Sequence, residues 1–181
     1  RVAVSDVEQG SIAFLEAGAA AVGFAAERYV MGRSLRGPDP YADEPIGSLR
    51  GDPHTVLTDD DVALHVEIDE PEDGDPADDL TVVFSHGYAL NLDAWHFQRR
   101  DLRGSARLVF WDHRSHGRSA RASEDVTLER LALDLGTVID AVAPTGPLVL
   151  IGHSMGGMTV LALARDRPEL ARAALLVEDL E

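Results

Sequence analysis

The residues best suited to do chemistry are Gly152, His153, Ser154, Met155 and Gly156, which follow the pattern Gly-x-Ser-x-Gly. This pattern is typical of a serine held on a sharp turn between a strand and a helix, with its hydroxyl exposed for nucleophilic attack. Glycine is expected at both flanking positions because so tight a turn leaves no room for a Cβ atom. The alternative interpretation is a serine that only caps the helix, since serine favours that position.

The flanking residues predict the strand and the helix that such a turn needs. Leu148–Ile151 is a short apolar run suited to a buried parallel strand, and Met155–Ala164 predicts the helix. A serine hydroxyl needs a neighbouring base to attack at neutral pH. His153 is excluded as that base, because adjacent side chains on such a turn diverge. None of the seven histidines follows Ser154; they are His54, His65, His86, His96, His113, His116 and His153.

Two further motifs stand at the ends of predicted strands. Phe84-Ser85-His86-Gly87-Tyr88 closes the strand predicted over Leu80–Ser85, and Asp112-His113-Arg114-Ser115-His116-Gly117-Arg118-Ser119 follows the one over Ala106–Trp111. The spacing of His113 and His116 would suit a metal ion, but no further ligand stands at a fitting distance in the sequence. We therefore expect no metal site, and interpret both histidines as surface or loop-bracing residues.

The remaining pattern predicts alternating strands and helices. The other predicted elements are strands over His54–Thr58, Val62–Ile68 and Ala173–Val177, and helices over Asp93–Leu102 and Thr127–Val142. The last helix has one apolar face at i, i+3, i+4 and i+7 spacing, formed by Leu128, Leu131, Ala132, Leu135, Val138, Ile139 and Val142. Such alternation predicts an α/β fold, with a mostly parallel sheet and helices on both of its faces.

Three regions are expected along the chain. Residues 1–36 form an alanine-rich helical leader, residues 37–53 a linker rich in proline, glycine and acidic residues, and residues 54–181 the α/β domain. A spanning helix needs about 20 mostly apolar residues, and the apolar run Ile12–Ala26 is shorter. We expect the leader to pack on the domain or on a partner, with membrane association as the alternative.

Composition narrows the class of partner. The 181 residues carry a net charge of −16, which argues against binding to nucleic acid through a basic patch. The absence of cysteine excludes disulfides and thiolate metal sites within this sequence. We expect a cytoplasmic protein, with membrane attachment or export as alternatives. The sequence does not determine the oligomeric state.

The three motifs, in this order at the ends of strands, resemble the α/β-hydrolase superfamily, in particular its esterase and haloperoxidase-like branch. The resemblance covers roughly residues 54–181. It implies that Ser154 is the nucleophile and that the backbone N–H groups of Tyr88 and Met155 form the oxyanion hole, with neither cofactor nor metal. His86 is expected to brace its loop. The aspartate and arginine of the Asp112–Ser119 turn are expected to bond to backbone groups.

In this superfamily the triad follows the order serine, acid, histidine. The resemblance therefore implies that the base comes after Glu181. The chain is interpreted as the N-terminal part of a longer hydrolase, so that the last strands of the fold are missing from it. Glu178 follows the strand predicted over Ala173–Val177, where some branches carry the acid. The preferred interpretation of Glu178 is an ordinary polar residue at the end of a strand.

The expected function is hydrolysis of an ester or similar small-molecule acyl substrate through an acyl-enzyme. Two alternatives stay open. One is a non-catalytic scaffold or binding module with a hydrolase-like fold. The other is a related enzyme that uses the same serine for acyl transfer, perhydrolysis or carbon–carbon bond cleavage.

Overall fold

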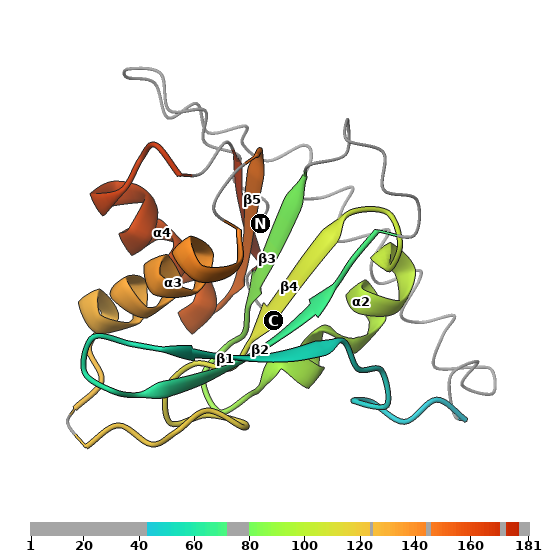
Figure 1. Cartoon of the computed structure of the whole chain (residues 1–181), viewed down its shortest axis with the longest axis horizontal. Helices are drawn as coiled ribbons and strands as arrows, with labels where there is room; N and C mark the ends of the chain where they lie inside the picture. Colours follow the sequence, from blue (N-terminus) through green and yellow to red (C-terminus); the bar gives the residue numbers. More distant parts are fainter. Residues whose placement is uncertain (1–42, 72–79, 124, 144–145, 171–172, 178–181) are drawn as a thin grey trace, which may run out of the picture.

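The computed structural model describes residues 43–71, 80–123, 125–143 and 146–170 in full, and residues 173–177 as backbone. Three strands come first in this part of the chain, and from the third strand onward strands and helices alternate (Figure 1). The elements in chain order are β1 (Asp52–Leu57), β2 (Ala63–Asp69), β3 (Thr81–Ser85), the 3₁₀ helix η2 (Leu92–Trp95), α2 (His96–Leu102), β4 (Arg107–Trp111), α3 (Leu128–Val142), β5 (Leu148–His153), α4 (Met155–Asp166) and β6 (Ala173–Val177).

The strands form one six-stranded sheet in the order β1-β2-β4-β3-β5-β6. β1 and β2 are an antiparallel hairpin, and β2 also runs antiparallel to β4. The other neighbours are parallel, and Ser85 at the end of β3 pairs with Trp111 on one side and Gly152 on the other. The carboxyl ends of β3, β4 and β5 are therefore level, and the loops that carry the three motifs leave the sheet at one edge.

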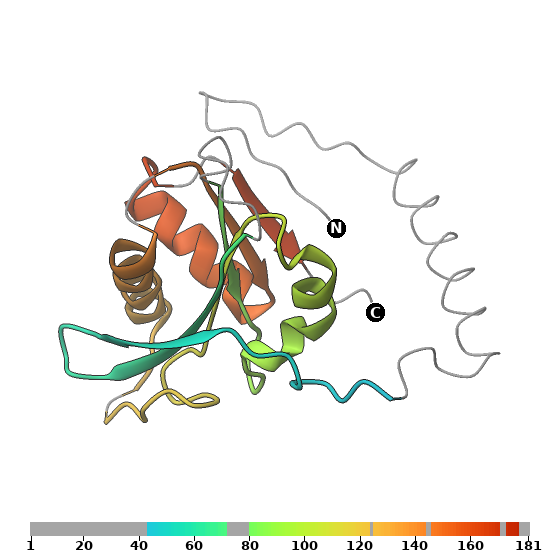
Figure 2. The same cartoon turned by 45° about the vertical axis from the view of Figure 1, so that its right-hand side comes forward.

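Helices cover both faces of the sheet, and each face has its own core. Figure 2 shows α3 and α4 on one side of the sheet, with η2 and α2 on the other. On the α3 and α4 side, Val83, Val109 and Leu150 pack with residues of both helices. On the η2 and α2 side, Phe84 stacks on Phe110 with ring centroids 4.6 Å apart. This alternation of neighbouring residues confirms the predicted α/β class.

Helix α3 forms as its periodicity predicts. Thr127 caps it, since the side-chain oxygen accepts the N–H of Arg130 at 3.2 Å. The predicted apolar face is buried, except that Leu128 is only half-buried. Asp134 is also buried in this helix, which the apolar pattern did not predict.

One predicted helix starts differently. The pattern predicts a single helix over Asp93–Leu102, whereas the structure has the 3₁₀ turn η2 before α2. Asn91 caps η2 by accepting the N–H of Asp93 at 2.8 Å. The Leu92 N–H is bound by the Asp112 carboxylate at 2.7 Å, so a distant loop decides where this helix begins.

The predicted leader and its apolar run, Ile12–Ala26, lie outside the described residues. Within the predicted linker, Glu44 Oε1 accepts a hydrogen bond from Nε2 of His96 at 3.1 Å, and the Gly47 N–H donates to Nδ1 of the same ring at 3.3 Å. β1 begins at Asp52, slightly before the predicted start of the domain. Each helix of the described ranges is too short or too polar to cross a membrane.

Leu135→Ala is expected to lower the free energy of unfolding by about 2–5 kcal/mol, because Leu135 is fully buried between α3 and the sheet. Leu133→Ala is the matched control, since Leu133 lies on the same helix and is 58% exposed. We expect it to change the free energy of unfolding by less than about 0.5 kcal/mol. Urea titrations of both variants measure the difference, and equal losses would contradict the assigned face of α3.

Candidate active site

Ser154 occupies a strained turn between β5 and α4. Its backbone has φ 50° and ψ −115°, a combination that residues with a side chain adopt rarely. Such a conformation costs on the order of 1–3 kcal/mol and persists where the surrounding structure imposes it, often at a functional site. The side chain is exposed and makes no hydrogen bond to the helix N-terminus, although it stands at the cap position. The alternative interpretation of Ser154 as a helix cap is therefore wrong.

The flanking glycines are required by packing. A Cβ on Gly152 would lie 2.5 Å from the carbonyl oxygen of Gly156, inside van der Waals contact. A Cβ on Gly156 would overlap the carbonyl group of Ser85 at the end of β3. The predicted steric reason for both glycines is confirmed. It also shows that the start of α4 lies directly against β3.

The loop after β3 lies beside the Ser154 turn. A Cβ on Gly87 would be 2.6 Å from Nδ1 of His153, so the two loops are in close contact. Tyr88 and Met155 line the same cavity, which has a volume of about 710 Å³. Neither backbone N–H donates a hydrogen bond to another residue in the described part of the chain. The structure thus brings both residues to one cavity, and no other described residue accepts a hydrogen bond from either N–H group.

His86 joins this loop to the next one. Its ring is fully buried, with Nδ1 donating to the Gly87 carbonyl at 2.8 Å and Nε2 accepting the His113 N–H at 3.1 Å. Burial is the largest cause that lowers the pKa of His86 to about 4, so the ring is uncharged near neutral pH. The predicted bracing role of His86 is confirmed.

The turn after β4 is held by Asp112 and Arg114 in two different ways. Asp112 is fully buried and accepts the backbone N–H groups of Leu92 and Arg118, each at 2.7 Å, as predicted. Arg114 differs from the prediction, because its guanidinium binds carboxylates instead of backbone groups. It donates twice to Asp134 of α3, at 2.6 and 2.8 Å, and twice to Asp60 of the β1–β2 turn, at 2.8 and 2.9 Å.

The electrostatic result is a paired, largely buried cluster. The hydrogen bonds that Arg114 donates to Asp60 and Asp134 raise the pKa of Arg114, and the same bond to Asp60 is the largest cause that lowers the pKa of Asp60. Arg114 and Asp134 are almost completely buried, whereas Asp60 is exposed. Asp134 was missed from the sequence; the only signal was an acidic residue beside the apolar stripe of α3.

His113 and His116 lie near each other but differ in burial. The interpretation of His113 as a surface or bracing residue is wrong, because its ring is fully buried and neither ring nitrogen has a hydrogen-bond partner among the described residues. Burial lowers its pKa well below the usual value. His116 is half-buried, lines the cavity of about 710 Å³, and braces the turn through Nδ1, which lies 2.9 Å from the Arg114 carbonyl oxygen. Its place in the cavity was missed, since no sequence signal relates it to Tyr88.

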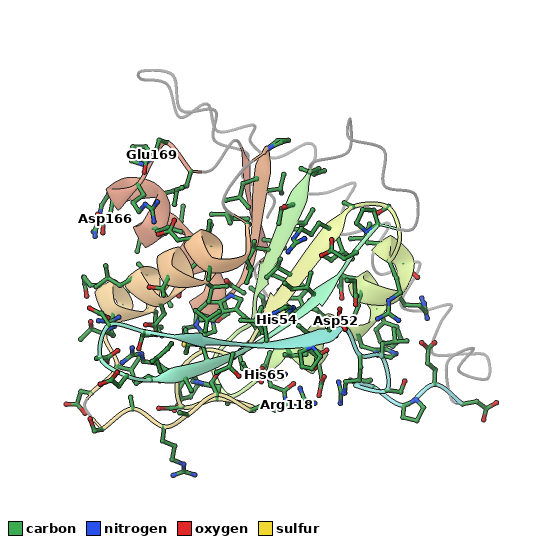
Figure 3. All side chains as sticks on the ribbon, in the orientation of Figure 1. Asp52, His54, His65, Arg118, Asp166 and Glu169 are labelled. Carbon is green, nitrogen blue, oxygen red and sulfur yellow. The ribbon has the colours of Figure 1, made fainter. Side chains whose placement is uncertain are left out.

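Among the described residues, no histidine follows Ser154, and the carboxylates that follow it lie away from it. Asp166 and Glu169 are the carboxylates after Ser154 in this part of the chain, and Figure 3 shows them at the end of α4 remote from the Ser154 turn. Glu178 lies outside the described residues. Among the described histidines, aspartates and glutamates, no group of three is placed to hold a metal ion.

Comparison with known proteins identifies the family of the chain. Residues 81–179 match the family described as alpha/beta hydrolase fold, and the chain belongs to that family. Both the predicted resemblance and the predicted fold are therefore confirmed.

The relatives are longer than this chain. It is 37% identical over 108 residues to a non-heme chloroperoxidase of Streptomyces lividans, which covers 59% of this chain and 39% of that protein. It is 32% identical over 108 residues to a bifunctional esterase/perhydrolase of Acinetobacter calcoaceticus, with 58% and 39% covered. A solved thermophilic esterase from Thermogutta terrifontis has a TM-score of 0.58 at 27% identity, covering 67% of this chain and 43% of that one. The chain spans about two fifths of these relatives.

The stability of the protein is expected to fall as the pH drops from about 6.5 to about 4, in part because of His86. The unfolded state binds a proton near pH 6.5, whereas folded His86 binds it only near pH 4, so acid favours unfolding between these values. Between about pH 7 and pH 4.5, the wild type should lose about 2 kcal/mol more free energy of unfolding than His86→Gln. Urea titrations at both pH values measure this, and parallel losses would contradict the buried neutral ring.

Asp134→Asn is expected to lower the free energy of unfolding by about 3 kcal/mol, because it leaves the buried Arg114 charge without its buried partner. Asp140→Asn is the matched control. Asp140 also binds an arginine through two hydrogen bonds, at 2.7 and 3.0 Å, but the pair with Arg167 is exposed. That loss should stay below about 1 kcal/mol. Urea titration measures both losses in free energy of unfolding. Similar losses in the two variants would show that burial does not increase the cost of breaking the pair of Arg114 and Asp134.

Proposed function

We propose that Ser154 is the nucleophile of a serine hydrolase that cleaves an ester, or a similar acyl bond, through an acyl-enzyme. One observation carries the proposal: a non-glycine residue with φ 50° and an exposed, uncapped hydroxyl at the N-terminus of α4. Strain at a residue that makes no compensating bond is expected where the exposed position itself is needed. This combination supports the proposal that Ser154 stands on a nucleophile elbow.

The N–H groups of Tyr88 and Met155 are proposed as the oxyanion hole. Their availability and their shared cavity support this role. Met155 opens α4, where the helix dipole favours negative charge. Each such donor can lower the barrier by roughly 3–4 kcal/mol, because it meets charge that develops only in the transition state.

In the proposed reaction, Ser154 Oγ attacks the acyl carbon and its proton passes to a base. The ester C–O bond then breaks, and the base returns that proton to the leaving alcohol. Water then attacks the acyl-enzyme and releases the acid. We infer that the base is a histidine outside these 181 residues, because the family order of serine, acid and histidine places it after Ser154, and none of the seven histidines follows that residue. In addition, His86 and His113 are buried and neutral, and His153 adjoins the serine. The acid is also proposed to come from elsewhere, with Glu178 as the one candidate within the sequence.

A second candidate is perhydrolysis at the same serine. It is favoured by the relatives, which include an esterase/perhydrolase and a chloroperoxidase. In that reaction hydrogen peroxide, in place of water, attacks the acyl-enzyme, so a peracid leaves and Ser154 is regenerated. An assay in which water and hydrogen peroxide compete for the acyl-enzyme would measure the ratio of carboxylic acid to peracid.

Ser154→Ala is expected to abolish labelling of the protein by a fluorophosphonate probe, because the probe bonds to an activated serine oxygen. In the full-length protein, the same change should lower kcat for 4-nitrophenyl acetate by about 10⁴-fold or more. Mass spectrometry of the labelled peptide identifies the modified residue.

Ser105→Ala is the control variant, because Ser105 is an exposed serine on the loop after α2 and before β4. It should be labelled like the wild type. Equal labelling of Ser154→Ala and wild type, together with unchanged ester hydrolysis, would refute the proposed nucleophile and favour a non-catalytic module.

A further inference from the structure

The cavity lined by Tyr88 and Met155 has both polar and apolar residues in its lining, which we call its polar wall and its apolar wall. The polar residues of the lining are Asn91, Ser115 and His116. Asn91 stands at the N-terminus of η2, and the other two lie in the turn after β4. The apolar wall is formed by Val126, Leu131 and Met158. Val126 precedes α3, Leu131 lies in α3, and Met158 lies in α4. A ligand complementary to this lining combines a polar group with an aliphatic part.

The tautomer of His116 follows from one contact. Its Nδ1 lies 2.9 Å from the carbonyl oxygen of Arg114, and a carbonyl can only accept, so Nδ1 carries the hydrogen. In the neutral ring, Nε2 then holds a lone pair and acts as an acceptor. This nitrogen makes no hydrogen bond with another residue in the described ranges. The ring is also held edge-on to Tyr88, with centroids 5.7 Å apart, so its orientation is restricted.

Ser115 and Asn91 supply the opposite capacity. Ser115 Oγ accepts the N–H of Ala122 at 3.0 Å, and Asn91 Oδ1 accepts the N–H of Asp93 at 2.8 Å. Each side chain thus uses an acceptor within the protein and retains its donor, the serine O–H and the asparagine N–H groups. The polar wall offers a ligand one acceptor and two kinds of donor.

From this wall we infer that the cavity selects a substrate whose acyl part carries a hydroxyl group, which donates to Nε2 of His116 and accepts from Ser115 or Asn91. A hydroxyl is the smallest group that does both. The aliphatic carbons beside it pack on Val126, Leu131 and Met158. The acyl side of the ester occupies this cavity because Tyr88 and Met155, the proposed donors to the acyl oxygen, line it as well. The inference rests on the proposed function of Ser154.

Two esters of equal chain length test the inference in the full-length protein. We expect kcat/KM for 4-nitrophenyl 3-hydroxybutanoate to exceed that for 4-nitrophenyl butanoate by about 10-fold, since a site that bonds a hydroxyl rejects the analogue without it. His116→Asn should reduce this ratio to about 1. The asparagine amide can still donate to the Arg114 carbonyl, but no atom replaces Nε2. His54→Asn, at an exposed histidine of β1 labelled in Figure 3, is the control and should keep the wild-type ratio.

A binding measurement separates the two proposals. In ¹⁵N-histidine-labelled Ser154→Ala, ethyl 3-hydroxybutanoate should move the Nε2 signal of His116 upfield, whereas ethyl butanoate should not. The signal is assigned by its absence in His116→Asn. A shift without any Ser154-dependent hydrolysis would refute the proposed function and support the hydroxyl site. Hydrolysis with equal rates for both esters, a ratio that survives His116→Asn, or no shift would each overturn the hydroxyl site.

Discussion

The arrangement of the site depends on one close approach between backbones. The first turn of α4 rests on the end of β3, where a Cβ on Gly156 would overlap the Ser85 carbonyl and one on Gly152 would meet the Gly156 carbonyl. With glycine at both positions, the chain can turn from β5 into α4 at a single residue, Ser154, which has φ 50°. The strain at Ser154 is therefore imposed by the packing of α4 on the parallel strands, which bury enough apolar surface to sustain it.

The loops around this turn are fixed by polar groups that have been removed from water. Asp112 holds the starts of η2 and of the segment after Gly117, and Arg114 ties the same turn to α3 and to the β1–β2 turn. Buried charges of this kind contribute little net stability compared with apolar packing, but they disfavour every arrangement that leaves one of them unpaired. These polar contacts therefore fix the positions of the loops that line the cavity. Apolar contacts, which are not directional, would restrict those positions less.

The sequence predicted the features that local rules govern. Periodicity identified α3 and the strands, and the glycine spacing identified the Ser154 turn, because both depend on residues within a few positions of one another. It did not predict the burial of His113, the pairing of Arg114 with Asp134 and Asp60, or the 3₁₀ start at Leu92. Each of these arises from a contact between loops that are distant in sequence. Asp134, for example, is buried only because Arg114 reaches α3 from the turn after β4.

The electrostatics of the cavity suit an anionic transition state despite the net charge of −16. The cavity lining among the described residues contains no carboxylate, and Asp112 and Asp134 nearby are each bound by donors. Exposed acidic groups farther away are screened within about 10 Å at moderate salt. His86 and His113 are uncharged near neutral pH, so as ions they would neither stabilise nor oppose the proposed oxyanion. The dominant local field is then that of the N–H groups at the start of α4 and of the loop at Tyr88, which is fixed by the same glycine contacts that expose Ser154.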